Sequence, residues 1–295
     1  MFELLGVPPQ ALFGQLLLGL INGAFYAMLS LGLAVIFGLL NVINFTHGAQ
    51  YMVGAFAAWA VLTYGGLSYW WALLIAPIAV AALGIVLERL FLRRLYNIDP
   101  VYGLLLTFGL ATILEGSFRQ HFGSSGMPYP IPDILSGGHN LGFMFLPNYR
   151  AWVVVASLIV CFVTWFLIER TRLGSYLRAA TENPKLVQAF GINVPRMVML
   201  TYAFGVGLAG LAGVMAAPIY QVSPLMGSNL IIVVFAVVVI GGMGSIVGSI
   251  ITGFGLGIVE GFTKVFYPEA SNTVIFVIMA IVLLIKPAGL FGQAR

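Results

Sequence analysis

The stretch "AWVVVASLIVCFVTWFLIERTR" (151–172) decides the fold of this chain. Residues 151–168 carry no charge, and Glu169, Arg170 and Arg172 follow directly. A helix that crosses a bilayer needs about 20 mostly apolar residues. Apolar side chains occupy every position of the run instead of alternating with polar ones, as they would in a barrel strand. The stretch therefore predicts a membrane-spanning helix that ends at a charged surface.

Similar runs fill most of the chain, which is 61% hydrophobic and only 7% charged. A soluble domain carries about 25% charged residues, and only helices and closed barrels satisfy their backbone in lipid. We therefore predict an all-α, polytopic helical membrane protein with a single domain over residues 1–295. The break "GGMGS" (241–245) divides one run in two, which gives eight or nine spans. Counted along the whole chain, the apolar runs lie near residues 11–40, 49–64, 70–92, 101–121, 151–168, 197–217, 229–264 and 273–287.

The basic residues predict how the chain is oriented. When the spans alternate in direction, ten Lys and Arg residues fall on one side and three on the other, and cytoplasmic loops carry the excess. The loop 170–196 and the C-terminus are then cytoplasmic, and the Gly- and Pro-rich loop 123–148 is external. No Lys or Arg precedes Arg89, so the first span lacks the basic flank of a secretory signal peptide and is expected to stay in the mature protein. The ten are Arg89, Arg93, Arg94, Arg170, Arg172, Arg178, Lys185, Arg196, Lys286 and Arg295; the three are Arg119, Arg150 and Lys264.

The segment "RAATENPKLVQAFGINVPR" (178–196) gathers charges in an otherwise apolar chain. Asn183 is a good N-cap, Pro184 suits the first helical position, and Gly191 suits the residue after a helix end. So short a helix is marginal in water unless it packs on something. Leu186, Val187, Phe190 and Ile192 give this helix one apolar side, while Lys185 and Gln188 stay polar. Two interpretations remain: the helix lies on lipid headgroups, or it docks on a soluble partner.

Polar residues also cluster around an interruption near residues 41–50. They are Asn44, Thr46, His47 and Gln50, joined by Asn22 in the first run. Irregular backbone at membrane depth survives only where protein or a water-filled cavity satisfies it. These residues are candidates for a translocation path, and structural capping of the break is the alternative. Two further pairs, Glu115 with Arg119 and Glu260 with Lys264, have the spacing of local helical ion pairs.

Several motifs exclude other classes of function. The chain contains no Gly-Lys dipeptide and hence no phosphate-binding loop of the GxxxxGK[ST] kind. The pattern "GVGLAG" (205–210) lies inside an apolar run without a βαβ context, so it indicates helix packing. The same holds for the small residues Gly19, Gly23, Gly253, Gly257 and Gly261. The single Cys161 excludes an internal disulfide and gives no metal site. We expect no enzymatic activity and no cofactor in this chain.

Four stretches together resemble one family. "GLAVIFGLLNVINFTHGAQYMVGAF", "RTRLGSYLRAATENPKLVQAFGIN", "VVVIGGMGSIVGSIITGFGLGIVEG" and "LLIKPAGLFG" are similar, in this order along the chain, to the LivH-type permeases of branched-chain amino acid ABC importers. The resemblance implies an inner-membrane permease that carries branched-chain or other small amino acids. A relative that imports urea or short amides would look similar. An ion-coupled secondary transporter, with Glu115 or Glu260 taking the proton, is an alternative of another class.

The resemblance also implies partners and a role for the charged loop. The loop would hold a coupling helix that sits in a groove on an ATP-hydrolysing subunit, and ATP would be used by that partner. Its coupling residues would be Glu182, Asn183, Pro184, Lys185, Leu186, Val187, Phe190 and Gly191. Ala179, Ala180 and Gly191 match the importer "EAA…G" pattern, but Arg178 stands where an acidic residue is common. The family implies a second homologous permease chain, two ATPases and an extracytoplasmic solute-binding protein.

Overall fold

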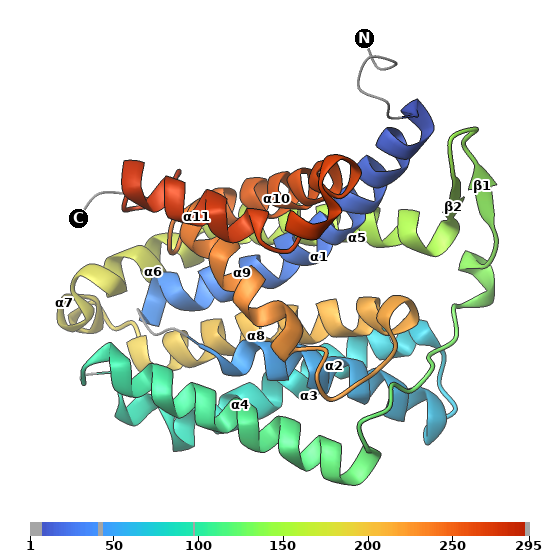
Figure 1. The fold of residues 1–295 in the computed structure, drawn as a ribbon. Coiled ribbons are helices and arrows are strands. Elements are labelled where there is room, and N and C mark those ends of the chain that lie inside the picture. Colours follow the sequence, from blue (N-terminus) through green and yellow to red (C-terminus); the bar gives the residue numbers. More distant parts are fainter. Residues whose placement is uncertain (1–7, 41–43, 97, 293–295) are drawn as a thin grey trace. The chain divides into compact units, whose positions relative to one another are not determined.

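The computed structural model describes residues 8–40, 44–96 and 98–292 (Figure 1). Helices dominate it, which confirms the all-α prediction. The α-helices are α1 (Pro9–Leu40), α2 (Thr46–Thr63), α3 (Tyr69–Leu90), α4 (Pro100–Phe122), α5 (Asn148–Glu169), α6 (Arg172–Glu182), α7 (Pro184–Ala189), α8 (Val194–Tyr220), α9 (Ser228–Gly241), α10 (Ile246–Phe266) and α11 (Val274–Ile285). Short 3-10 turns are η2 (Leu92–Arg94), η3 (Asp133–Leu135) and η4 (Pro268–Ala270). Strands β1 (Gly138–Asn140) and β2 (Phe145–Pro147) form an antiparallel hairpin.

Within the described ranges, six helices are long and apolar enough to cross a membrane: α1, α3, α4, α5, α8 and α10. Helices α9 and α11 are apolar but shorter, and α2 has 18 residues. At 1.5 Å per residue, α9 is about 21 Å long, less than the roughly 30 Å of a bilayer core. The predicted eight or nine spans therefore require α9, α11 and, for the ninth, α2 to cross together with the residues that flank them.

The chain folds into two compact units. The first comprises residues 1–30, 131–161 and 233–295, and the second comprises residues 31–130 and 162–232. Helices α1, α5 and α9 each begin in one unit and end in the other. The expectation of one permease domain over the whole chain stays a prediction.

In the second unit, α2, α3 and α8 pack on one another, and α4 packs on α2 (Figure 1). Glycines permit the close approach of these helices. A Cβ atom added at Gly205 would lie 2.7 Å from the carbonyl oxygen of Gly32, and one at Gly210 would lie 2.9 Å from Cβ of Val80. The pattern "GVGLAG" is thus a packing surface in the middle of α8, as predicted.

In the first unit, α10 packs along the first half of α1 through the predicted small residues. A Cβ atom added at Gly23 would lie 3.0 Å from Cα of Phe254. The predicted break between α9 and α10 is also present, because Gly242 and Gly244 have φ of +104° and +85°. Ser245 then caps α10 by accepting a hydrogen bond from the backbone N–H of Gly248 at 3.1 Å. The loop 123–148 is ordered and contains η3 and the hairpin.

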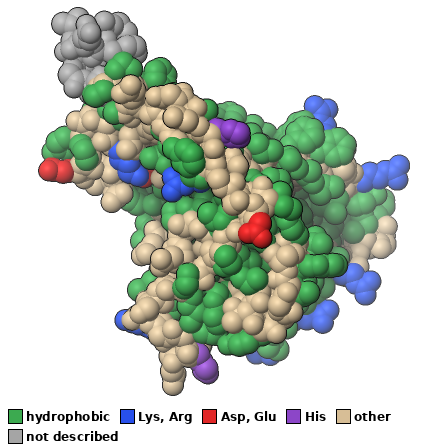
Figure 2. All heavy atoms as spheres, turned by 90° about the vertical axis from the view of Figure 1, so that its right-hand side faces the viewer, with side chains coloured by type: hydrophobic (Ala, Val, Ile, Leu, Met, Phe, Trp, Pro, Cys, Tyr) green, Lys and Arg blue, Asp and Glu red, His purple; other side chains and the backbone are tan. Residues whose placement is uncertain are grey.

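The surface is as apolar as the composition requires. Figure 2 shows hydrophobic side chains over most of one face, with a few charged ones between them. Ile78 on α3, Phe162 on α5 and Leu284 on α11 are 68%, 62% and 84% exposed. Exposing so many large apolar side chains to water is unfavourable, whereas lipid acyl chains can cover them.

Candidate functional site

The first candidate site is the short helix α7 and the connections around it. Its residues fold locally as the sequence predicts. The Asn183 side chain accepts a hydrogen bond from the backbone N–H of Leu186 at 3.0 Å, and Pro184 occupies the first helical position. Gly191 has a φ of +83°, which an L-residue with a side chain adopts only at a cost. The predicted boundaries of this helix are confirmed.

The apolar residues of α7 divide between two directions. Val187 is buried against Ala180 of α6 and Val194 of α8, and Ile192 packs on the same cluster. Leu186 and Phe190, in contrast, are 55% and 78% exposed. The predicted single apolar side is therefore wrong in detail: Val187 holds α7 on the protein, and Leu186 and Phe190 point away from it. The other polar members of the predicted set, Glu182 and Lys185, are exposed.

The helix α6 is fixed to the end of α5. Arg178 forms an ion pair with Glu169 at 3.3 Å, and the Arg170 guanidinium lies 5.5 Å from the centroid of the Trp165 ring. A Cβ atom added at the buried Gly174 would overlap the carbonyl oxygen of Ile168, so the turn between α5 and α6 accepts only glycine there. The exposed face of α7 is thus carried on a defined support and is chemically suited to bind an apolar groove.

The second candidate site is the polar cluster at the start of α2. Asn44, Thr46, His47 and Gln50 are at most 1% exposed, and all belong to the second unit. The carboxamide NH2 groups of Asn44 and Gln50 donate to the Tyr202 hydroxyl oxygen at 3.3 and 3.1 Å. The Gln50 amide also donates to the Thr46 hydroxyl at 3.3 Å. These bonds bring Asn44, Thr46 and Gln50 together, and His47 lies buried in the same first turn of α2.

Further bonds tie this network to the helix start. The Thr46 hydroxyl and backbone N–H both donate to Oδ1 of Asn44, the latter at 3.1 Å. The backbone N–H of Phe45 donates to the Thr107 hydroxyl at 3.2 Å. These bonds satisfy backbone and side-chain groups at the beginning of α2, which is what structural capping requires. Asn22 lies half-buried in α1 in the first unit, and residues 41–43 of the predicted break lie outside the described residues.

Sequence reasoning missed Tyr202, which accepts two of these bonds. One signal was present, since a tyrosine inside a long apolar run has a hydroxyl group that needs a partner. The same is true of Tyr26, whose hydroxyl donates to Oε2 of Glu260 at 2.7 Å in the first unit.

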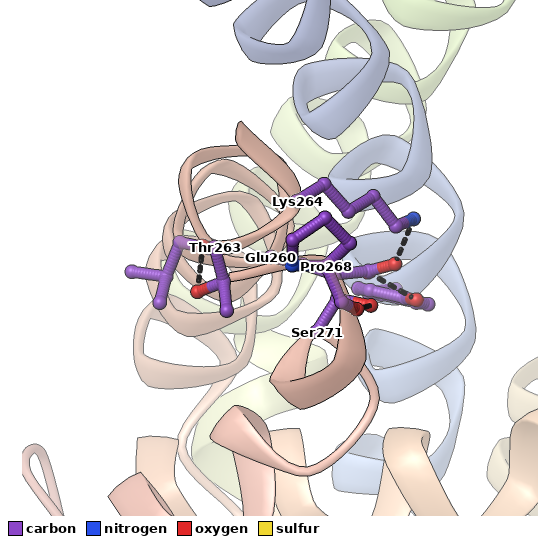
Figure 3. Close-up of polar contacts among 7 residues, drawn as sticks. Glu260, Thr263, Lys264, Pro268 and Ser271 are labelled. Carbon is purple, nitrogen blue, oxygen red and sulfur yellow. Dashed lines mark hydrogen bonds and ion pairs between the residues drawn. The ribbon is translucent and has the colours of Figure 1, made fainter. Parts of the chain in front are cut away.

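Glu260 and Lys264 form the predicted ion pair, with Nζ 2.5 Å from Oε1 (Figure 3). Glu260 is 4% exposed, and each oxygen of the buried carboxylate accepts one hydrogen bond, from Lys264 and from Tyr26. The other predicted pair is not formed. Among the described residues Glu115 and Arg119 make no ion pair.

A further buried carboxylate, Glu88 near the end of α3, was not singled out from the sequence. It is 2% exposed and accepts a hydrogen bond from the Tyr96 hydroxyl at 2.9 Å. Burial, followed by the nearby Glu88 carboxylate, raises the pKa of Tyr96 well above its usual value. The tyrosine therefore remains a hydrogen-bond donor to Glu88 at any physiological pH.

Sequence comparisons with known families and proteins match most of the length of this chain. A family model described as "Branched-chain amino acid transport system / permease component" matches residues 15–283. The chain is 28% identical to the high-affinity branched-chain amino acid transport system permease protein LivH of Escherichia coli, and 30% identical to BraD of Pseudomonas aeruginosa. Each of these alignments covers 95% of both chains. It is also 26% identical to LivM of Escherichia coli, over 92% of this chain and 68% of that one.

Among solved structures, the chain is similar to PsaBC from Streptococcus pneumoniae in complex with Fab. The TM-score is 0.47 at 15% identity, with 91% of this chain and 89% of that one covered. The extent of the family match, nearly from end to end of the described helices, identifies the chain. It belongs to the family of branched-chain amino acid transport system permease components.

Proposed function

We propose that this chain is the membrane-spanning permease subunit of an ATP-driven importer for branched-chain amino acids. The proposal names α7 as the element that couples it to separate ATPase subunits. The similarity to LivH and BraD supports the substrate class, and the similarity to LivM, a second type of permease, supports a paired permease chain. Two ATPases and an extracytoplasmic solute-binding protein complete the proposed complex. ATP is bound and hydrolysed by those ATPases and not by this chain.

The observation that carries the coupling role is the divided surface of α7. Val187 anchors the helix, whereas Leu186 and Phe190 expose large apolar surface beside charged neighbours in the loop 170–196. A six-residue helix that held itself together by its own backbone would be marginal in water. Its cap, its anchor and its outward apolar pair suit an element that transmits force to a soluble partner.

The substitution Phe190→Asp tests this role. A carboxylate placed in a partner's groove loses its water without gaining a counter-ion, which costs about 3–5 kcal/mol. In the reconstituted complex we expect weakened ATPase binding and loss of leucine uptake, while the permease still folds. Ile134→Asp is the matched control, because Ile134 is 79% exposed in the loop 123–148. Unchanged assembly and uptake in Phe190→Asp would contradict the coupling role.

The proposed orientation places the loop 170–196 in the cytoplasm and the loop 123–148 outside. Gln188 and Ser125 are both exposed, and Cys161 is buried. Single cysteines at these two positions, in a Cys161→Ala background, should react with a membrane-impermeant maleimide from opposite sides of the inner membrane. Labelling of both from the same side would overturn the orientation.

The substrate class has its own test. In the complete reconstituted complex, leucine, isoleucine and valine loaded on the binding protein should stimulate ATP hydrolysis and appear inside the vesicles. Urea and short amides should not. Stimulation of ATP hydrolysis by urea alone would assign the chain to the amide-importing branch of the same family. Uptake driven by a proton gradient without the ATPases would exclude an ATP-driven importer.

A further inference from the structure

A cavity of about 550 Å³ lies in the second unit, beside the element just described. Its walls come from the end of α5, the start of α6, the connection from α7 to α8, and the first three turns of α8. The side chains of Leu167, Leu173, Tyr176, Leu200 and Phe204 give it a largely apolar lining. This volume is within the range of small-molecule sites, which bind with apolar walls and a few polar groups.

Arg196 alone is charged among the described residues that line the cavity. The two other polar side chains of the α8 wall are used within the protein. Asn193 caps α8 by accepting from the backbone N–H of Arg196 at 3.0 Å, and the Thr201 hydroxyl donates to the carbonyl of Met197 at 2.9 Å. Neither ion pair found among the described residues involves Arg196. The cavity therefore offers an apolar volume with one cation that has no carboxylate partner.

The position of the cavity along the helices narrows the class of ligand. It lies where α5 ends and α8 begins, and Arg170, Arg172 and Lys185 occur in the same loop. On α5, Phe162 and Phe166 are 62% and 49% exposed and precede the lining residue Leu167. A surface suited to acyl chains thus leads along α5 to a pocket at the basic ends of the helices, which in the orientation proposed above lie among the headgroups of the inner leaflet.

Two other ligands fit less well. A zwitterionic amino acid needs partners for both charges, and none of the described residues that line this cavity has a carboxylate. A partner ATPase would seat on the exposed residues of α7, but Leu186 and Phe190 do not line the cavity. An anionic phospholipid can place one of its two acyl chains in the apolar volume and its negative phosphate beside the single cation, so it matches both features.

We propose that this cavity binds an anionic phospholipid of the cytoplasmic leaflet, with its phosphate on Arg196 and an acyl chain between α5, α6 and α8. Binding would also affect the coupling element. Ile192 and Met197 line the cavity and also pack on the cluster of Val187 and Val194 that holds α7. An acyl chain in the cavity supports these two side chains, and so stabilises α7 in the position seen here.

The test is native mass spectrometry of the purified chain, titrated with phosphatidylglycerol or phosphatidylcholine of the same chain length. The wild-type protein should retain phosphatidylglycerol in preference to phosphatidylcholine. Arg196→Gln should lower the affinity for phosphatidylglycerol about fivefold, to a value close to the affinity for phosphatidylcholine. Leu200→Trp, which fills the cavity and leaves the cation, should weaken both lipids. Arg172→Gln is the matched control, since Arg172 is exposed in the same loop but does not line the cavity.

Three outcomes would overturn the proposal. Equal losses in Arg196→Gln and Arg172→Gln would indicate unspecific attraction to the basic surface. Unchanged binding in Leu200→Trp would show that no acyl chain enters the cavity. Release of the bound phosphatidylglycerol when the ATPases or the second permease chain assemble would show that a protein covers this surface. None of these measurements depends on transport, so they fail or succeed independently of the proposed function.

Discussion

The substitution Tyr202→Phe tests whether the buried polar network holds the second unit together. It removes only the hydroxyl oxygen that accepts hydrogen bonds from Asn44 and Gln50 at 3.3 and 3.1 Å. Each buried donor left without its acceptor costs about 1–3 kcal/mol. Both amides keep a weaker contact, at 3.5 Å between Asn44 and Gln50 and at 3.3 Å between Gln50 and Thr46. We therefore take the lower limit for each and expect a loss of about 2 kcal/mol in the free energy of unfolding.

The chain provides a matched control in the same unit. Tyr51 is as deeply buried as Tyr202, and its hydroxyl has no hydrogen-bond partner among the described residues. Tyr51→Phe removes the same atom without breaking a bond, so stability should stay constant or rise slightly. Both variants are measured by denaturant titration in detergent micelles. Equal stability of the two variants would refute the structural role of the network.

The same pair of variants distinguishes the two interpretations of this cluster. If Asn44, Thr46, His47 and Gln50 only cap the start of α2, leucine flux per folded complex is unchanged in Tyr202→Phe. If they line a translocation path, flux falls while stability does not. The mutual bonds of Asn44, Thr46 and Gln50 favour the first result, because groups that bind a passing solute would need acceptors and donors left over.

Three further predictions concern stability. Lys264→Met leaves Glu260 buried without its cation and should lower the melting temperature. The double variant Lys264→Met with Glu260→Gln should recover most of this loss. If it recovers none, the ion pair does not stabilise the protein. Gln221 has φ +62° and ψ 152°, a region suited to glycine, so Gln221→Gly should stabilise by about 1 kcal/mol in the same denaturant titration. A destabilised variant would show that the strain is not there. Asn183→Ala removes the cap of α7 and should speed hydrogen exchange of the Leu186 amide about fivefold, for a loss of about 1 kcal/mol. Exchange at the wild-type rate would mean that packing alone holds α7.

Features set by a local backbone conformation could be predicted from the sequence. The end of α7 at Gly191 and the break at Gly242 and Gly244 depend on positive φ values that glycine adopts at little cost. The cap at Asn183 depends on a side chain that reaches only three residues ahead. Most spans follow from the lengths of apolar runs, because a bilayer fixes how long they must be.

Features that depend on distant residues could not be predicted. Tyr202 accepts from Asn44 and Gln50, more than 150 residues before it, and no periodicity joins positions so far apart. The pair of Glu115 and Arg119 has the spacing of a helical ion pair, but spacing alone does not fix the side-chain rotamers, and no ion pair forms between them among the described residues. The buried face of α7 was also missed, because six residues are too few for helical periodicity to separate Val187 from Leu186.

The charged residues differ in how deeply they are buried. Among the described residues, each deeply buried carboxylate is bonded to a tyrosine hydroxyl: Glu260 to Tyr26 in the first unit and Glu88 to Tyr96 in the second. A carboxylate that carried protons across the membrane would have to exchange its partners during each cycle, and breaking such buried bonds is costly. The hydrogen bonds from the tyrosine hydroxyls therefore favour a structural role for these two carboxylates over a role in proton transfer. The charges of the loop 170–196 are exposed, so the contacts that change during transport are expected there, at α7 and at the cavity of Arg196.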